Sequence, residues 1–209
     1  MSAREEILGR VRAAIAGAQA GGPIPREYRT TTDDGLDVFL DRLAHYDAVT
    51  NVVDPNDLTE TIRTALNSRR QIVVPAGIPE HWTTELEYPL TDDPPLTHDQ
   101  IDASDGVITT CAVAIAQTGT IVLDAGPGMG RRALTLLPDY HLCVVRHDQI
   151  VSSVPEAIAR LETHTTRPLT FISGPSATVD IEMTRVRGVH GPRRLEVVVA
   201  TTPQTTEET

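Results

Sequence analysis

Strand-like and helix-like segments alternate along most of this chain, and this alternation limits its possible folds more than any other feature. Short apolar runs typical of buried strands are separated by stretches of about ten residues with apolar side chains at helical spacing. The order predicts an α/β fold in which a mostly parallel sheet is flanked by helices. Strands are expected at 48–53, 71–75, 106–123, 141–146, 169–172 and 195–200, and helices at 34–46, 57–69, 153–162 and 178–187.

Two stretches interrupt the pattern. The strand-like segment 106–123 is broken at Thr118-Gly119, which predicts a β-hairpin or a bent strand inserted in the parallel sheet. Residues 76–97 are poor in apolar side chains and contain Pro79, Pro89, Pro94 and Pro95, so we expect mostly loop there.

The N-terminus predicts a separate helix. Ser2 and Glu5 have the spacing of a capping box, and Ile7, Val11 and Ile15 form a narrow apolar stripe. A Gly-Gly-Pro sequence follows. The expected organisation is an N-terminal helix (1–20), a linker (21–32), an α/β domain (33–200) and a flexible polar tail (201–209).

The charge composition excludes several functions. The net charge is −11 and all 18 basic residues are arginine, so a lysine Schiff base and a P-loop lysine are impossible. The acidic balance argues against a nucleic-acid partner. No apolar run approaches the ~20 residues of a membrane span, and the amphipathic start differs from a secretory signal, so a cytoplasmic protein is expected.

The cysteines and histidines do not predict a metal centre. Cys111 and Cys143 are the only cysteines, and both lie in apolar stretches that favour burial as reduced thiols. An iron–sulfur cluster needs about four thiolates, and structural zinc usually needs four Cys or His ligands. The seven histidines form no HxH or HxxxH pair. We therefore expect no metal and no cofactor bound by this chain alone.

Ligands of open α/β sheets bind at the carboxyl ends of the strands, so the loops after predicted strands are the candidate sites. The strongest runs from Ser173 through Gly174-Pro175 into the predicted helix 178–187. Ser176 or Thr178 could cap that helix, and a helix start attracts a carboxylate or phosphate. Asp180 and Glu182 could serve the helix dipole, or act as a general base or substrate ligands.

Three other loops are candidates. His190 lies between glycines before a strand, where it could transfer protons or bond to the backbone of a turn. Gly119 could permit a bulge or the close approach of a ligand, beside the polar side chains of Gln117 and Thr118.

The fourth loop, 124–132, imitates a dinucleotide fingerprint. Its third glycine comes one residue early and Pro127 lies inside the turn, which disfavours a Rossmann site. A small-anion loop assisted by Arg131 or Arg132 is the remaining interpretation.

Three motifs together resemble the LUD-domain family, and more narrowly its lactate-utilisation protein C branch. They are Ser173-Gly174-Pro175-Ser176 with Asp180-Ile181-Glu182, then Gly188-Val189-His190-Gly191-Pro192, and the segment 114–123 around Gln117-Thr118-Gly119. The resemblance covers roughly residues 30–200. Two positions depart from it: Gln117 replaces the usual Glu, and Ala177 replaces a frequent basic residue.

The resemblance implies a fold like that of the glucosamine-6-phosphate deaminase, ribose-5-phosphate isomerase and CoA-transferase group. It implies a part in oxidising L-lactate to pyruvate together with two partner proteins that carry iron–sulfur clusters. A small hydroxy- or keto-acid would bind in a strand-end cleft. The expected catalytic residues are His190, Asp180 and Glu182, and the expected ligand-binding residues are Gln117, Thr118, Gly119, Gly174, Pro175, Ser176, Thr178, Gly191 and Arg131.

Two alternatives use the same fold. In the first, the chain is a non-catalytic assembly or metabolite-sensing subunit, which the changes at Gln117 and Ala177 favour, and the N-terminal helix docks a partner. In the second it is an autonomous acyl- or sugar-phosphate enzyme, which the absence of lysine disfavours. A homo-oligomer is compatible with any of these, and whether the chain is itself an enzyme stays open.

Overall fold

The secondary structure follows the alternation closely. The computed structural model describes residues 2–17, 22, 24–25, 27–162, 166–178, 186–188 and 191–202. Its helices are α1 (Ala3–Ile15), α2 (Leu36–His45), α3 (Leu58–Leu66), α4 (His98–Asp102) and α5 (Val154–Leu161), with short 3₁₀ turns η1 (Glu80–Trp82), η2 (Arg132–Thr135) and η3 (His147–Gln149). Its strands are β1 (Val49–Val53), β2 (Ile72–Val74), β3 (Leu90–Thr91), β4 (Gly106–Thr109), β5 (Val113–Ile115), β6 (Thr120–Leu123), β7 (Tyr140–Arg146), β8 (Ile150–Val151), β9 (Thr170–Ile172), β10 (Ala177–Thr178), β11 (Val186–Arg187) and β12 (Arg194–Ala200).

Six strands form the main sheet in the order β1-β12-β7-β4-β2-β3, and each neighbouring pair is parallel. This confirms the predicted α/β fold with a mostly parallel sheet flanked by helices. The last strand, β12, pairs with both β1 and β7, so it lies inside the sheet. β3 and α4 were not predicted, since they are short and lie in or beside the proline-rich loop.

A second sheet has the order β8-β5-β6-β9. β5 and β6 form the expected hairpin, with antiparallel pairing from Val113–Val122 to Ile115–Thr120. The prediction that this hairpin is inserted in the parallel sheet is wrong, because both of its strands belong to the second sheet. β5 and β6 are buried at every position, so their apolar pattern identifies strands without showing which neighbours they pair with.

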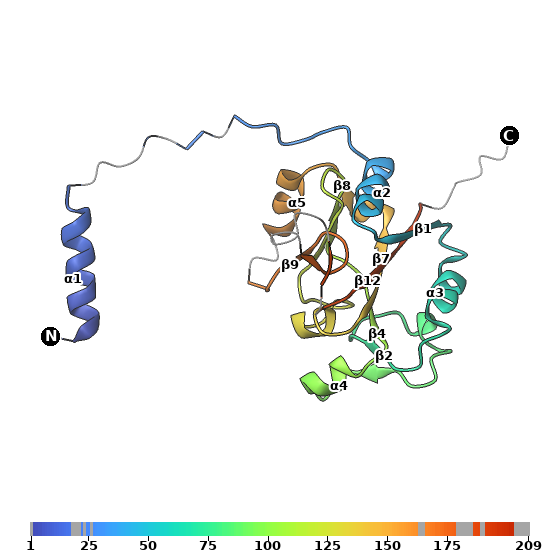
Figure 1. Ribbon diagram of the computed structural model, residues 1–209. Coiled ribbons are helices and arrows are strands. Elements are labelled where there is room, and N and C mark those ends of the chain that lie inside the picture. Colours follow the sequence, from blue (N-terminus) through green and yellow to red (C-terminus); the bar gives the residue numbers. More distant parts are fainter. Residues whose placement is uncertain are drawn as a thin grey trace.

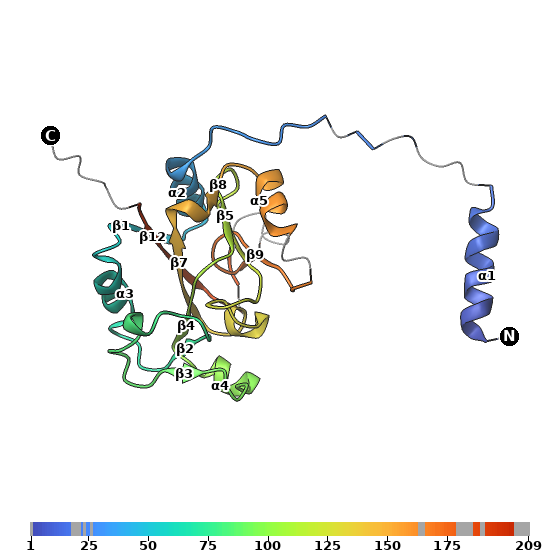
Figure 2. The ribbon, with the colours of Figure 1, turned by 180° about the vertical axis from the view of Figure 1, so that it is seen from behind.

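The two sheets pack face to face, and helices cover their outer sides (Figures 1 and 2). Side chains alternate across each strand, so Leu142 and Val144 of β7 pack in the cluster with α3, while Cys143 and Val145 face the second sheet. α5 covers the outer side of β5 and β6. The largest cluster lies between the sheets and includes Phe39 and Leu43 of α2, as the helical stripe predicts.

α1 stands apart from the α/β body (Figure 1). It has the predicted capping box, in which Ser2 and Glu5 exchange hydrogen bonds, and it contains no buried residue. The end of the expected linker is anchored to the domain: Ser153 Oγ donates to the Thr30 carbonyl at 2.5 Å, and Thr32 N donates to Ser152 Oγ at 3.0 Å. No described helix is long and apolar enough to cross a membrane.

The C-terminal end of the chain differs from expectation in two places. The prediction of a helix over 178–187 is wrong at its described ends, because Thr178 pairs with Val186 in the antiparallel β10–β11 pair. Thr178 therefore lies in a short strand. The expected tail begins at 201, yet Thr201 donates from N and Oγ1 to the Val53 carbonyl at 2.9 and 3.1 Å. Residues 203–209 lie outside the described residues.

Candidate functional site

One cavity of about 330 Å³ is lined by residues of the two C-terminal motifs, 173–176 and 188–192. We call it the Ser176 cavity. It is bounded by β9 and the loop that follows it, and by the first residues of β7 and β12. The described lining residues include no Asp, Glu, Lys or Arg, so the wall is polar in places but uncharged. They are Thr135, Leu136, His141, Thr170, Phe171, Ile172, Ser173, Gly174, Pro175, Ser176, Gly191, Pro192 and Leu195.

Two motifs that are distant in the sequence meet at Ser176. Its N donates to the Pro192 carbonyl at 2.8 Å, and its carbonyl accepts from Gly188 N at 2.9 Å. A Cβ at Gly188 would lie 2.2 Å from Ser176 Oγ and 3.1 Å from Ser176 Cβ, so a larger residue there would force Ser176 to shift. Four predicted ligand-binding residues, Gly174, Pro175, Ser176 and Gly191, therefore line one cavity.

The cavity lies at a different edge of the main sheet from the one predicted. The prediction was the carboxyl ends of the parallel strands. The loop does follow the carboxyl end of β9, but β9 belongs to the second sheet and runs antiparallel to β6. His141 and Leu195 are the second residues of β7 and β12, so the cavity lies at the amino ends of these main-sheet strands.

A chain of hydroxyl groups connects Thr118 with the cavity loop. Thr118 Oγ1 and Thr120 Oγ1 are 2.7 Å apart, and Thr120 Oγ1 and Ser173 Oγ are also 2.7 Å apart. In each pair either oxygen can donate. The hairpin motif and the Gly-Pro-Ser motif are thus joined directly, which holds the start of the cavity loop against β6.

The other five predicted ligand-binding residues are absent from the described lining of the cavity: Gln117, Thr118, Gly119, Thr178 and Arg131. Gly119 has φ +60° and its missing side chain leaves room for α2, since a Cβ there would lie 2.6 Å from Arg42 Cβ. The group that lies closest to Gly119 is therefore α2 of this chain. Gln117 N donates to the Ser152 carbonyl at 3.1 Å, and Thr178 is exposed in β10.

The three predicted catalytic residues, Asp180, Glu182 and His190, lie outside the described residues. Gly188 and Gly191, which flank positions 189–190, both approach Ser176. Gly191 also lines the Ser176 cavity, whereas Gly188 is absent from its described lining.

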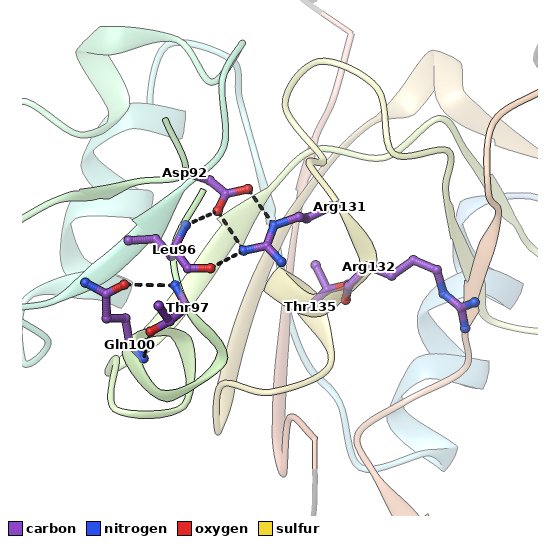
Figure 3. A network of polar contacts seen from close by, with 7 residues as sticks. All are labelled: Asp92, Leu96, Thr97, Gln100, Arg131, Arg132 and Thr135. Carbon is purple, nitrogen blue, oxygen red and sulfur yellow. Dashed lines mark hydrogen bonds and ion pairs between the residues drawn. The ribbon is translucent and has the colours of Figure 1, made fainter. Parts of the chain in front are cut away.

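Arg131 is engaged elsewhere (Figure 3). Its Nε and Nη2 donate to the two carboxylate oxygens of Asp92 at 2.9 and 3.0 Å, and Nη2 also donates to the Leu96 carbonyl at 2.5 Å. The hydrogen bond from Arg131 holds the pKa of Asp92 below its usual value. This ion pair joins the segment after β3 to the loop 124–132, which we call the glycine loop. Arg132 points the opposite way.

The glycine loop borders two larger hollows at the carboxyl ends of the main-sheet strands. Their volumes are about 960 and 730 Å³, and Gly77 and Pro127 line both. The arginines near them have carboxylate partners: Arg167 Nη1 is 2.9 Å from buried Asp124, and Arg146 Nε is 3.0 Å from Asp148. No predicted ligand-binding residue lines either hollow among the described residues.

The described residues contain no group of three His, Cys, Asp or Glu side chains that could hold a metal ion. Cys111 and Cys143 are both buried, as expected. The hydrogen bond with Cys143, together with burial, raises the pKa of the Cys111 thiol well above its usual value. Cys111 therefore stays protonated near neutral pH.

His141 lines the Ser176 cavity but was not among the residues predicted for a site. It is fully buried in β7, and a hydrogen bond of 2.7 Å joins its Nε2 to Thr109 Oγ1. Burial lowers the pKa of His141 to about 4, so the imidazole is neutral near pH 7. The available signal was a histidine directly before the apolar run 142–145 of a predicted strand.

Comparison with known proteins gives consistent matches. The family model described as the LUD domain matches residues 28–200. The lactate utilization protein C of Deinococcus radiodurans is 47% identical over 201 residues, which cover 94% of this chain and 95% of that protein. The lactate utilization protein C of an Exiguobacterium species is 37% identical over 98 residues, which cover 44% of this chain and 42% of that protein. A crystal structure of a DUF162 family protein from Deinococcus radiodurans superposes with a TM-score of 0.69 at 46% identity, over 78% of this chain and 94% of that chain.

Proposed function

This chain belongs to the LUD-domain family, in the branch of the lactate utilization proteins C, and we propose that it is a component of an L-lactate oxidation system. Its part would be to bind a small hydroxy- or keto-acid in the Ser176 cavity. The role in lactate utilisation is supported by its relatives, and the ligand class is our inference from the site.

The observation that carries the proposal is the convergence of separate motifs on one small cavity. Gly174, Pro175 and Ser176 lie on its wall with Gly191, although 14 residues separate Ser176 from residue 191 in the numbering. Ligand pockets of proteins are commonly about 300–1,000 Å³. A cavity of about 330 Å³ is at the small end of that range and suits an acid of a few carbon atoms.

The wall would recognise polar oxygen atoms through neutral groups. Hydroxyls of Ser176 and Thr170 and the imidazole of His141 stand among apolar side chains such as Leu136 and Leu195. Apolar surroundings strengthen each hydrogen bond to the ligand. Because no described lining residue is charged, we expect modest affinity, as suits a metabolite that must also be released.

The proton of the lactate hydroxyl needs an acceptor. We propose His190 for this step, with Asp180 and Glu182 as further candidates. Their support is the resemblance of the motif, and for His190 also the next residue in the sequence, Gly191, which lines the cavity.

The two electrons need a separate acceptor. Oxidation of lactate to pyruvate releases two electrons and two protons. Two cysteines are too few for an iron–sulfur cluster on this chain, so the electrons would pass to iron–sulfur partner proteins. The purified chain alone should not turn over lactate, and catalytic turnover without partners would contradict this part of the proposal.

Ligand-induced thermal shift tests the binding proposal. The panel contains L-lactate, D-lactate, pyruvate, glycolate, phosphate, NAD and acyl-CoA. A ligand at a hundred times its Kd stabilises the folded state by about 2.7 kcal/mol, which raises the Tm by a few degrees for a chain of this size. We expect a shift with lactate or pyruvate that is lost in Ser176→Ala.

A matched variant controls for the loss of a hydroxyl. Ser68→Ala removes the same group from an exposed position outside the Ser176 cavity, and it should retain the shift. No shift with any acid, or an equal shift in Ser176→Ala, would contradict ligand binding in this cavity.

One observation favours a second candidate function, a non-catalytic assembly subunit. Ile7, Val11 and Ile15 of α1 are 60%, 49% and 59% exposed, so the apolar stripe has no partner within the described chain. Under this alternative, Ser176→Ala leaves lactate-dependent growth intact, whereas Val11→Glu abolishes it.

A further inference from the structure

His141 contains a buried polar atom that the fold does not satisfy. The residue is 0% exposed, and Nε2 is bonded to Thr109 Oγ1 at 2.7 Å. Nδ1, on the other side of the ring, has no hydrogen-bond partner, and it is the one such side-chain atom found among the described residues. Buried polar groups in native proteins are nearly always paired, so an unpaired one calls for an explanation.

The location of His141 suggests what the missing partner is. Alternation along β7 places its side chain on the same face as Cys143 and Val145, which face the second sheet. β9, in that second sheet, lines the Ser176 cavity, and so does His141 itself. The unsatisfied atom therefore belongs to a side chain directed into the layer where the cavity lies.

We propose that Nδ1 of His141 hydrogen-bonds the oxygen atom next to the carboxylate of the bound acid, which is the hydroxyl of a hydroxy-acid or the carbonyl of a keto-acid. This rests on the proposed function and names the contact that would distinguish such acids from simple carboxylates. The role is one of binding and positioning, and His190, Asp180 and Glu182 keep the proposed proton transfer.

Thr109 allows His141 to bond both the hydroxy-acid and the keto-acid. A hydroxyl can donate or accept a hydrogen bond, so Thr109 Oγ1 complements either neutral tautomer of His141. When Nε2 carries the proton, Nδ1 accepts from the hydroxyl of lactate. When Thr109 donates to Nε2, Nδ1 carries the proton and donates to the carbonyl of pyruvate.

The neutral state of the ring fits this use. Burial lowers the pKa of His141 to about 4, so both tautomers are neutral near pH 7 and neither adds a charge to the cavity. The hydrogen bond to the ligand can then change direction as lactate is converted to pyruvate, without a net gain or loss of protons by the His141–Thr109 pair.

Two amide variants separate the two ring nitrogens. The Asn amide reaches roughly as far as Nδ1, and the Gln amide roughly as far as Nε2. His141→Gln therefore retains a partner for Thr109 and removes the group that faces the ligand. His141→Asn retains a polar group for the ligand and removes the contact with Thr109.

Isothermal titration calorimetry with L-lactate, pyruvate and propionate measures the effect, and propionate is the matched acid without the second oxygen. We expect wild-type protein to bind lactate and pyruvate more tightly than propionate. His141→Gln should bind both about tenfold or more weakly, close to propionate, whereas His141→Asn should lose less than threefold.

The outcomes separate this inference from the proposed function. If wild type binds the acids and His141→Gln binds them equally well, the inference is overturned and the proposed function stands. If wild type binds no acid, the binding proposal fails and the inference fails with it. Should His141→Gln not fold, ¹⁵N NMR of wild-type His141 decides: an Nδ1 resonance unchanged at saturating lactate and pyruvate overturns the inference.

Discussion

The burial of His141 predicts a specific loss of stability in mild acid. Its pKa is about 4 in the folded protein, compared with 6.5 for a free histidine, and the cause is desolvation. As pH falls below 6.5, the unfolded chain binds a proton at this residue and the folded chain does not. Stability from this lowered pKa is therefore fully present above pH 6.5 and is lost progressively as pH falls toward 4.

The size of this loss follows from the difference between the two pKa values. One pKa unit corresponds to about 1.4 kcal/mol, so the difference is worth about 3 kcal/mol in total. About 2 kcal/mol of it is lost between pH 7 and pH 5. His141 is fully buried, so solvent screening does not reduce this figure appreciably.

Urea denaturation at pH 7, 6, 5 and 4 measures the loss of stability that comes from His141. The assay compares wild type with His141→Gln, which cannot titrate but keeps a partner for Thr109. From pH 7 to pH 5, the unfolding free energy of wild type should fall by about 2 kcal/mol more than that of His141→Gln. Carboxylates with lowered pKa values, such as Asp92, also lose stability in acid, but they are common to both proteins and cancel.

Two results would refute the reasoning. A pH-independent difference between the two proteins would show that His141 titrates alike in the folded and unfolded states. A difference that moves in favour of wild type in acid would mean that the folded protein binds the proton more tightly.

Three further predictions follow from contacts outside the cavity. Gly119→Ala should destabilise the fold by about 2 kcal/mol or more in urea denaturation, because φ is +60° and the new Cβ would lie 2.6 Å from Arg42 Cβ. Asp92→Asn should cost about 1–2 kcal/mol at pH 7, because it removes the charge from a partly buried pair with Arg131. Deletion of residues 1–20 should leave the Tm unchanged in calorimetry, because α1 buries no residue.

Each of these has its own control. Gly17→Ala lies beyond α1, where an added Cβ meets nothing within 4 Å, and it should be neutral. The cost of Asp92→Asn should shrink as pH falls, since wild-type Asp92 then becomes protonated and loses the same charge. A Tm lowered by the deletion would show that α1 packs on the domain.

Local patterns were sufficient for most elements. The stripe at Leu58, Ile62 and Leu66 predicted α3 and its buried face, because helical spacing depends only on local geometry. The capping box of α1 was equally local. The predicted helix over 178–187 shows the limit at its described ends. Hydroxyl and acidic residues suit a helix start or a turn alike, and the pairing of Thr178 with Val186 places these two residues in strands.

The candidate site was predictable only in its parts. The motif showed that Gly174–Ser176 and Gly191 belong together, through resemblance to a family. The sequence could not show that β9 lies outside the parallel sheet, and this moved the cavity from the expected edge to the amino ends of β7 and β12. Arg131 was a reasonable anion ligand until the fold placed Asp92 beside it.

By itself, the sequence determined the α/β class and most of the helices and strands, since composition and periodicity are properties of the chain alone. Only the tertiary structure showed that both hairpin strands, β5 and β6, belong to the second sheet. It also showed that α2 packs against Gly119, and that His141 is buried with one nitrogen lacking a hydrogen-bond partner. These features depend on contacts between residues far apart in the sequence, and no local pattern encodes such contacts.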